Sequence, residues 1–256
     1  MLVYTLFSGS SGNCTYIKGE QAQILIDAGC SARAIEQALM QLGSSLEKID
    51  DIFITHEHSD HTGGLEIISK KYNIPVHFTY PSYDKAVREK TFLKRSAIRH
   101  DSEFEKEVGD LKIKSFRIPH DSAYNVGYVI SCGGIRLGSA TDIGHVTEEI
   151  AYALRGCKYV ILEANHDIEM LKNGPYPPFL KERILSENGH LSNKNTARLS
   201  CYLSENGTEQ ITLAHLSREN NTPSLALDTV CELLTKNNLS LDVAVASPSE
   251  PTLVTR

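Results

Sequence analysis

Apolar and polar residues alternate along the chain in patterns that predict strands and helices in regular succession. Short runs of β-branched and aromatic residues, bounded by glycine or polar turn residues, have the pattern of strands. These predicted strands cover residues 2–8, 14–19, 22–29, 50–55, 74–80, 111–120, 158–165, 210–217 and 241–247, and a hairpin is predicted over 126–144. Segments with a helical period fall between them, which predicts two sheets covered by helices.

The segment 31–43 illustrates the helical pattern. Ile35 and Leu39 share one face, Ser31 is a candidate N-cap, and Gly43 would end the helix. Further helices are predicted over residues 65–72, 146–156, 178–188, 192–205 and 224–237. No stretch rich in Pro, Gly or Ser divides the sequence, so residues 1–256 are expected to form a single domain.

A dense group of potential metal ligands follows the predicted strand at residues 50–55. The sequence there is THEHSDHTGG, which contains His56, His58, Asp60 and His61. In one α-helix these side chains would point to different faces, so one ion could not take all four. The spacing also departs from HExxH, because position 60 is an aspartate. A tight loop could instead direct His56 and His58 to one ion, and Asp60 and His61 to a neighbouring ion.

Three later strands end on residues that can complete two such sites. We assign His120 to the first ion, His215 to the second ion, and Asp142 to a position that bridges both. Imidazole mixed with carboxylate suits Zn²⁺ best, with Mn²⁺ or iron as alternatives, and the thiolates of structural zinc sites are not among these residues. The pattern therefore favours a catalytic centre with two divalent metal ions.

Composition and charge narrow the class of protein. The sequence has 256 residues, 41% of them hydrophobic, and a formal net charge of −6, so contact with nucleic acid would need a local basic patch or bound metal. Six cysteines without a CxxC pair, and an N-terminus without a leader pattern, predict a cytoplasmic protein. Apolar runs stay well short of the ~20 residues that cross a bilayer, so no membrane partner is expected.

Several stretches resemble a known superfamily. THEHSDHTGG, together with His120, Asp142 and His215, resembles the metallo-β-lactamase fold superfamily over almost the whole chain. SGSSGN, LEANHDIEMLKNGPYP, ILSENGHLSN and LAHLSRENN are similar to the YycJ/WalJ-like family, bacterial proteins regarded as probable metal-dependent nucleases or phosphodiesterases. This resemblance implies an α/β fold, a four-layer αββα sandwich with a two-metal site at one edge between the sheets.

Hydrolysis is the reaction that the ligand set favours. Two neighbouring cations can activate a shared water molecule and stabilise the entering and leaving oxygens of a displacement. Redox members of the superfamily commonly have a glutamate where this chain has His58, so di-iron electron transfer is less favoured. Asp60 is counted among the catalytic residues as well as among the metal ligands.

His190 and Glu163 are the candidates for proton transfer. In the tRNA 3′-processing and phosphodiesterase members of the superfamily, a similar Gly-His pair backed by a carboxylate is implicated in protonating the leaving oxygen. Carried over to this chain, His190 would be the general acid or a phosphate ligand, and Glu163 would orient it. The alternatives are a helix-end position for His190 and a structural or solvated position for Glu163.

Further substrate contacts are expected from LAHLSRENN. Its residues Ser217, Arg218 and Asn220 join His190 as candidate substrate-binding residues. Tyr176 and Phe179, in NGPYPPF, are candidates for stacking on a base, although a core position is the favoured interpretation.

Other polar residues have weaker patterns. Residues 85–99 are rich in Lys and Arg, which favours a solvated helix face over a surface that follows a phosphate backbone. Asp27 lies at a strand end. It is equally suited to hydrogen-bond a metal-bound histidine and to stabilise a turn or cap a helix. His166 and Asp167 are equally suited to substrate contact and to packing. Three histidines outside these motifs are expected to be solvated: His77, His100 and His145.

The sequence thus predicts a metal-dependent hydrolase, with a phosphodiesterase or nuclease acting on DNA or RNA favoured. One alternative is a glyoxalase-II-like thiolester hydrolase, which would share the metal site but need no general acid. Another is a metal-containing regulatory or interaction protein with little turnover. Residue types alone leave open the choice between DNA and RNA, between exo and endo cleavage, and the oligomeric state.

Overall fold

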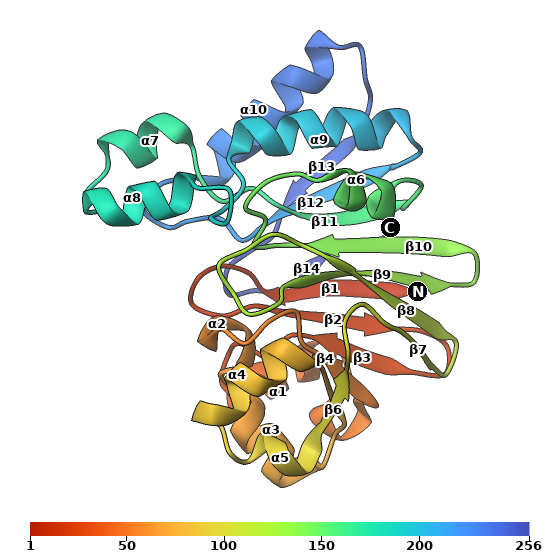
Figure 1. The fold of residues 1–256 in the computed structure, drawn as a ribbon. Coiled ribbons are helices and arrows are strands. Elements are labelled where there is room, and N and C mark those ends of the chain that lie inside the picture. The colour runs from red at the N-terminus through yellow and green to blue at the C-terminus, as the bar shows by residue number, and fades with distance from the viewer. Residues whose placement is uncertain (256) are drawn as a thin grey trace.

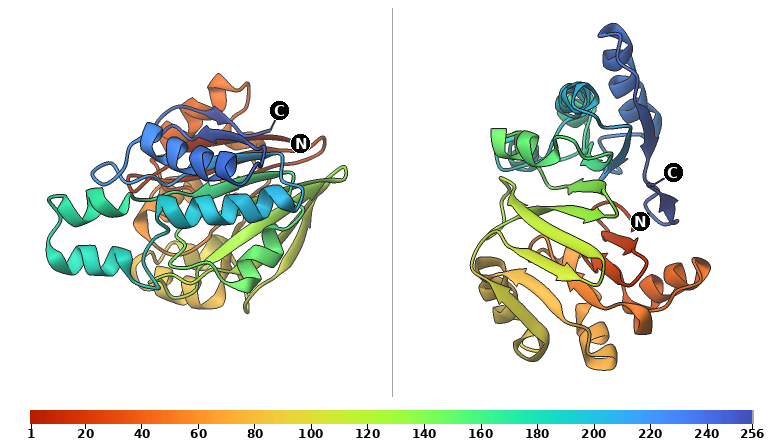
Figure 2. Two further views of the ribbon diagram at one scale, coloured as in Figure 1. Left: turned by 90° about the horizontal axis from the view of Figure 1, so that it is seen from above. Right: turned by 90° about the vertical axis from the view of Figure 1, so that its right-hand side faces the viewer.

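The chain folds into two seven-stranded sheets that pack face to face, with helices on both outer faces. The computed structural model describes residues 1–255, except for the side chains of Glu89, Arg95 and Ser96. Figure 1 shows the four layers from helix to sheet to sheet to helix, and the right-hand view of Figure 2 shows them from another side. The predicted αββα sandwich is confirmed.

The N-terminal sheet has the strand order β14-β1-β2-β3-β4-β5-β6. Strands β1 to β3 form an antiparallel meander, and β3 to β6 run parallel to one another. The last strand of the chain closes the sheet beside the first, pairing Leu253 with Tyr4. The strands are β1 (Leu2–Phe7), β2 (Cys14–Lys18), β3 (Gln23–Ile26), β4 (Asp51–Phe53), β5 (Val76–Thr79), β6 (Ala97–His100) and β14 (Thr252–Leu253).

The C-terminal sheet has the order β13-β12-β11-β10-β9-β8-β7. Strands β7 to β10 are antiparallel neighbours, and β10 to β13 are parallel. Each sheet therefore joins an antiparallel meander to a parallel half. The strands are β7 (Glu105–Val108), β8 (Leu111–Arg117), β9 (Val126–Cys132), β10 (Ile135–Ala140), β11 (Tyr159–Glu163), β12 (Gln210–Ala214) and β13 (Asp242–Val245).

Helices connect the parallel strands, because a parallel pair needs a long crossover. Those in the N-terminal half are α1 (Ala32–Gln41), the 3₁₀ helix η1 (Leu46–Lys48), α2 (Ser59–Thr62), α3 (Leu65–Tyr72), α4 (Tyr80–Glu89) and α5 (Leu93–Ser96). Those in the C-terminal half are α6 (Glu148–Leu154), α7 (Ile168–Asn173), α8 (Pro178–Leu185), α9 (Asn193–Glu205) and α10 (Pro223–Lys236). Helices α9 and α10 cover the C-terminal sheet, whereas α7 and α8 project to its side (Figure 1).

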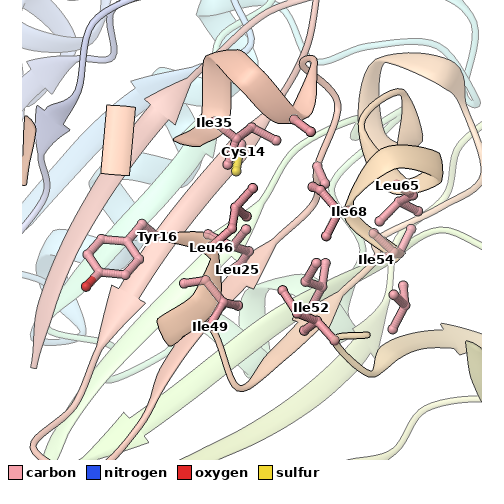
Figure 3. Close-up of a cluster of buried hydrophobic side chains, with 14 of the residues drawn as sticks. Cys14, Tyr16, Leu25, Ile35, Leu46, Ile49, Ile52, Ile54, Leu65 and Ile68 are labelled. Carbon is pink, nitrogen blue, oxygen red and sulfur yellow. The ribbon is translucent and has the colours of Figure 1, made fainter. Parts of the chain in front are cut away.

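Apolar side chains fill the space between the layers. In the cluster of Figure 3, Leu25 and Ile52 from the N-terminal sheet meet Ile35 of α1 and Ile68 of α3. All four side chains are fully buried, and burying a side chain of this size contributes about 1.5–3 kcal/mol. A further cluster joins the inner faces of the two sheets. The strand ends that carry the polar residues are therefore held by packing on both sides.

Some elements differ from the sequence-based expectation. Strands β6 and β7 were not predicted, because most of their residues are exposed or half-buried and lack apolar alternation. Helix α7 was also missed, since its six residues are too few to show a helical period. The predicted helix 31–43 is confirmed as α1, whose N-cap Ser31 accepts a hydrogen bond from Ala34 N.

The expectation of solvated histidines was wrong for His77. This side chain is fully buried, stacks on Phe53 with ring centroids 4.5 Å apart, and lies between two polar partners. Its Nε2 is 2.7 Å from Asp51 Oδ1 and its Nδ1 is 2.9 Å from His100 Nε2. His145, in contrast, is exposed as expected. Pairing with Asp51 makes the burial of an imidazole tolerable.

Candidate metal centre and active site

The predicted ligands lie where strands of both sheets end. His56 and His58 follow β4, and Asp60 and His61 lie in α2, directly after that loop. The others follow strands of the C-terminal sheet: His120 after β8, Asp142 after β10 and His215 after β12. Five of the seven line one cavity of about 260 Å³: His58, Asp60, His120, Asp142 and His215. His56 and His61 are fully buried, and their ligand nitrogens lie within 4.8 Å of ligand atoms of that set.

Three strand exits turn through a left-handed backbone conformation. Asp27, Asp142 and His215 have φ values of 61°, 59° and 56°. For residues other than glycine this conformation costs roughly 1–3 kcal/mol, and such strain is concentrated at functional sites. At these positions the turn aims a carboxylate or an imidazole at the cavity or at a ligand beside it.

His56, His58 and His120 form the first candidate ligand group. Their ligand nitrogens lie within 4.8 Å of one another. The Thr55 hydroxyl donates to Asp27 and lies 3.0 Å from His56 Nδ1, so it can accept the proton of that nitrogen. His56 Nε2 is buried without a hydrogen-bond partner. His120 Nδ1 donates to Gly189 O at 3.0 Å, which leaves its Nε2 to bind an ion.

Asp60, His61 and His215 form the second candidate group, again with ligand atoms within 4.8 Å. His61 Nδ1 donates to Asp27 Oδ2 at 2.7 Å, and His215 Nδ1 donates to Glu163 Oε1 at 2.9 Å. Both imidazoles are thereby held with Nε2 towards Asp60, at 3.4 Å and 3.7 Å from Asp60 Oδ2. His215 Nε2 has no hydrogen-bond partner among the described residues. This carboxylate–histidine arrangement is characteristic of metal sites.

Asp142 lies between the two groups. One of its oxygens is 3.3 Å from His61 Nε2 and the other is 3.8 Å from His120 Nε2. It also lies within ligand distance of His56 and His215. Its Oδ2 is buried and has no hydrogen-bond partner in the described part of the chain. Asp142 therefore occupies the position expected of a bridging ligand.

The donor atoms and their charges fit two divalent cations. Burial by itself would raise the pKa of Asp142, but the charges of His215 and His61 lower it. Burial and the neighbouring histidines hold the pKa of His56 well below its usual range. The ionised carboxylate of Asp142 and the neutral imidazole of His56 are forms that bind metal. Burial alone would lower the pKa values of His61 and His215, but the neighbouring carboxylates raise them, so these two imidazoles would release a proton on binding an ion. Several of these buried atoms lack a hydrogen-bond partner, so their lone pairs are free to bind such ions.

Glu163 and His190 meet at the same cavity. His190 Nδ1 donates to Glu163 Oε1 at 2.8 Å, and the second carboxylate oxygen accepts from Ile143 N at 2.7 Å and Leu191 N at 3.0 Å. Glu163 is fully buried, whereas His190 lines the cavity. Burial opposes a charge on His190, but the charge of Glu163 raises its pKa above the usual value. The pair can hold a proton beside the metal-binding groups.

Comparison with known proteins identifies the family. The family model described as "Beta-lactamase superfamily domain" matches residues 22–215. The chain is 33% identical to exodeoxyribonuclease YycJ of Bacillus anthracis, over 97% of this chain and 96% of that protein. The chain belongs to the YycJ/WalJ family of the metallo-β-lactamase superfamily. It is also 35% identical to exodeoxyribonuclease WalJ of Streptococcus pneumoniae serotype 2, over 93% of this chain and 90% of that protein.

A solved structure of the superfamily has the same fold. The metallo-β-lactamase fold protein YhfI from Bacillus subtilis superposes with a TM-score of 0.74, covering 98% of each chain at 13% identity. The fold of this YycJ/WalJ-family chain is therefore the one expected from its sequence-based assignment to the superfamily. Within the part of the chain that the structure describes, no helix is both long and apolar enough to cross a membrane.

The predicted substrate-binding residues of this YycJ/WalJ-family protein fall in different places. Ser217 lines the cavity together with His190. Arg218 lies nearby and donates from Nη2 to Ser11 Oγ at 2.9 Å. Asn220 is fully buried and donates from its backbone to Ser217 Oγ at 3.2 Å, so it stands behind the cavity wall. Its position favours support of Ser217 over direct substrate contact.

The two aromatic residues of NGPYPPF, Tyr176 and Phe179, lie in different environments. Tyr176 lines the cavity and is half-buried, so it is available for contact with a substrate. Phe179 does not line this cavity, and 72% of its surface is exposed, so a core position was the wrong expectation for it. In the same stretch of chain, Asp167 caps α7 by accepting from Met170 N at 2.8 Å. His166 is buried, and neither ring nitrogen has a hydrogen-bond partner.

The basic segment 85–99 makes several contacts of its own. Lys85 pairs with Glu57 at 2.8 Å, and Arg88 pairs with Asp84 within the same helix. Arg99 lies over the Tyr83 ring, and the side chain of Arg95 lies outside the described residues. These contacts favour the predicted solvated face.

Sequence reasoning left one residue around the site undecided and missed two others. Asp27, left undecided, orients His61. Asp121 has one carboxylate oxygen 3.2 Å from His120 Nε2, and Arg183 of α8 donates to the other. Asp121 follows His120 directly, and this adjacency was the only signal for it. Arg183 had none, because its contact depends on how α8 packs against a segment about sixty residues earlier.

Proposed function

We propose that this protein is a metal-dependent phosphodiesterase that acts on nucleic acid, with DNA as the first substrate to test. The observation that carries the proposal is the Glu163–His190 pair beside a group of seven potential metal ligands, five of which line the same cavity as His190. Relatives named exodeoxyribonucleases, at 33% and 35% identity over nearly the whole chain, support DNA as the substrate.

Two divalent ions would be held by the two groups, with Asp142 shared between them. The first group is His56, His58 and His120; the second is Asp60, His61 and His215. We propose Zn²⁺ as the ion, with Mn²⁺ or iron as alternatives, because imidazole predominates over carboxylate. When bound, such ions lower the pKa of water and stabilise charge on a phosphate.

The protein's own residues would position and protonate the substrate. His190 Nδ1 is engaged by Glu163, so Nε2 is the atom from which a proton would pass to the leaving oxygen. Glu163 stabilises the imidazolium and fixes the ring. Asp60 reaches the cavity, where its carboxylate could hold the attacking water by a hydrogen bond as well as bind an ion. Ser217 and Tyr176 line the walls available to the substrate.

A comparison of substrates tests the proposal. Protein loaded with Zn²⁺ or Mn²⁺ is assayed on single-stranded DNA, double-stranded DNA, RNA, bis-p-nitrophenyl phosphate and a glutathione thiolester. We expect cleavage of DNA and of the small diester, with loss of both on chelation. Turnover of the thiolester alone would overturn the proposal in favour of a thiolester hydrolase. Bound metal without turnover of any substrate would favour a regulatory protein.

Two further expectations belong to this proposal. All six cysteines are free thiols, which suits the reducing cytoplasm as the site of action. We also propose that residues 1–256 act as a single domain, because the inner faces of both sheets contribute to one apolar cluster. Limited proteolysis that released a stable half would contradict the second point.

A further inference from the structure

Arg183 of α8 stands at the wall of the metal-binding cavity. Among the described residues that line this cavity it is the only lysine or arginine. Its side chain is 56% exposed, so it can meet a ligand without rearrangement of the core. Leu180 and Ile184, three residues before it and one after it, line the cavity from the same helix.

The guanidinium of Arg183 is held in a way that leaves its outer edge free. Its Nε donates to Asp121 Oδ2. In the described part of the chain, neither Nη1 nor Nη2 has a hydrogen-bond partner. A guanidinium anchored at Nε presents two parallel N–H groups, which match two oxygens of one phosphate.

Asp121 fixes where that phosphate would lie. Its Oδ1 is 3.2 Å from His120 Nε2, and its Oδ2 holds Arg183, so one carboxylate separates the guanidinium from the candidate metal ligands. The backbone N–H of Asp121 also donates to Asn188 O at 3.0 Å, which ties this position to the chain after α8. Because Asp121 contacts both His120 and Arg183, it occupies the space between the guanidinium and the candidate metal ligands. The free edge of Arg183 is therefore placed for a second phosphate, next to the one at the metal site.

Tyr176 lines the same cavity as Arg183. It precedes α8 and is half-buried. An aromatic ring and a phosphate-binding arginine in one cavity can together recognise a nucleotide, since a base can stack on the ring. The segment around α7 and α8 projects to the side of the C-terminal sheet (Figure 1; left-hand view of Figure 2). It can extend the surface along which a strand would lie.

We propose that Arg183 binds the phosphate next to the scissile one in a nucleic acid strand, with Tyr176 contacting the adjoining nucleotide. This inference rests on the proposed function and adds a subsite to it. The second phosphate is either an internal diester or a terminal monoester. Both present the same oxygens to the guanidinium, and substrates of defined length separate them.

The test uses metal-loaded wild type, Arg183→Ala, Arg183→Lys and a control, Arg198→Ala. Arg198 is an exposed arginine of α9 that does not line this cavity, and its Nη1 donates to Asn195 Oδ1. Two substrates carry only the scissile phosphate: bis-p-nitrophenyl phosphate and a dinucleotide without terminal phosphates. Three others carry a second phosphate: the same dinucleotide with a 5′-phosphate, the dinucleotide with a 3′-phosphate, and a trinucleotide.

We expect Arg183→Ala to raise KM for at least one substrate with a second phosphate roughly 10- to 100-fold, because charge-assisted hydrogen bonds are lost. KM for the two substrates with one phosphorus should stay unchanged. Arg183→Lys should recover part of the loss, since it restores the charge without the paired donors. The substrate that loses most identifies the second phosphate as internal, 5′-terminal or 3′-terminal. Equal losses on all substrates would place Arg183 at the scissile phosphate and overturn the proposal.

A binding measurement separates this inference from the proposed activity. Fluorescence anisotropy with a labelled, cleavage-resistant phosphorothioate oligonucleotide gives the dependence of log K on log salt. Arg183→Ala should lower the magnitude of that slope by about 0.7, the value for one contact to a single strand. Arg198→Ala should leave the slope unchanged. An unchanged slope for Arg183→Ala contradicts the subsite even if the enzyme cleaves DNA.

The contribution of Tyr176 to oligonucleotide binding is tested against Phe179, an aromatic residue of the same segment. Tyr176→Ala should weaken oligonucleotide binding several-fold, and Tyr176→Phe should not, because stacking needs the ring and not the hydroxyl. Phe179→Ala removes an exposed ring that does not line the cavity and should have no effect. Equal losses from Tyr176→Ala and Phe179→Ala would assign the effect to the segment as a whole and exclude Tyr176 from the subsite.

Discussion

Glu163 Oε1 lies 2.8 Å from His190 Nδ1, and the same oxygen lies 2.9 Å from His215 Nδ1. One buried carboxylate thus orients the candidate proton donor and a candidate metal ligand together. The sequence suggested the first contact but not the second. With the roles proposed for His190 and His215, proton transfer and metal binding would both depend on this one side chain.

Replacing Glu163 should therefore affect both properties. We expect Glu163→Gln to weaken metal binding at the second site roughly 10- to 100-fold, as is usual when the partner of a metal-bound histidine is lost. Diester cleavage should fall even at saturating metal, because His190 is no longer held. The measurement is a metal titration followed by an activity assay at saturation. Full activity at saturation would separate Glu163 from proton transfer.

His190 should matter most for poor leaving groups. A general acid typically contributes ~10² to 10⁴-fold when the leaving oxygen needs its proton. His190→Ala should therefore depress kcat on an oligonucleotide far more than on bis-p-nitrophenyl phosphate, whose leaving group departs unaided. Metal content should remain normal, because the two proposed ligand groups and the shared Asp142 do not include His190. Loss of metal would instead favour the alternative group that joins His190 to Asp142, Glu163 and His215. Equal losses on both substrates would point to phosphate binding in place of acid catalysis.

Asp27 should act on metal affinity through His61. Its Oδ2 accepts from His61 Nδ1 at 2.7 Å, and the residue sits in a left-handed turn at the end of β3. Asp27→Ala should weaken binding of one of two ions roughly 10- to 100-fold. The control is Asp110→Ala, because Asp110 also accepts backbone N–H groups, but its hydrogen-bond partners among the described residues are Glu20, Gln21 and Cys132, none of which is a candidate metal ligand. Comparable effects of both variants on metal affinity would contradict this account.

His100 should make the protein less stable in mild acid. Burial and the charges of His77 and Lys106 lower the pKa of His100 to about 4, against about 6.5 for an unfolded histidine. Between pH 6.5 and 4 this histidine is protonated in the unfolded chain but remains neutral in the folded chain. The free energy of unfolding therefore decreases as pH drops through this range. The urea midpoint of His100→Gln should decline less over this window than that of wild type. His145→Gln, at an exposed position, should decline as wild type does.

Strand ends and local motifs are the features that could be predicted from the sequence. The alternation of strands and helices predicted the two covered sheets, and His56, His120, Asp142 and His215 were found because each comes after an apolar run. Contacts between distant segments could not be read in this way. The pairing of Arg183 with Asp121 joins α8 to the loop after β8, and nothing local marks it.

The burial of His77 also could not be predicted from the sequence pattern. His77 lies on a strand with apolar residues on either side, but its pairing with Asp51 comes from a neighbouring strand. A histidine that looks solvated in the sequence is thus part of the inter-sheet contact. Strand β6, beside it, was missed because an edge strand with exposed Ile98 and Arg99 lacks alternation.

The central claim is that two metal ions share Asp142 and drive diester hydrolysis. The most direct measurement is the metal content of purified Asp142→Ala beside wild type and His145→Ala, by elemental analysis together with DNA cleavage. We predict two equivalents in wild type and in His145→Ala, and less than one in Asp142→Ala, with loss of cleavage. Two tightly bound ions in an Asp142→Ala protein that still cleaves DNA would contradict the claim.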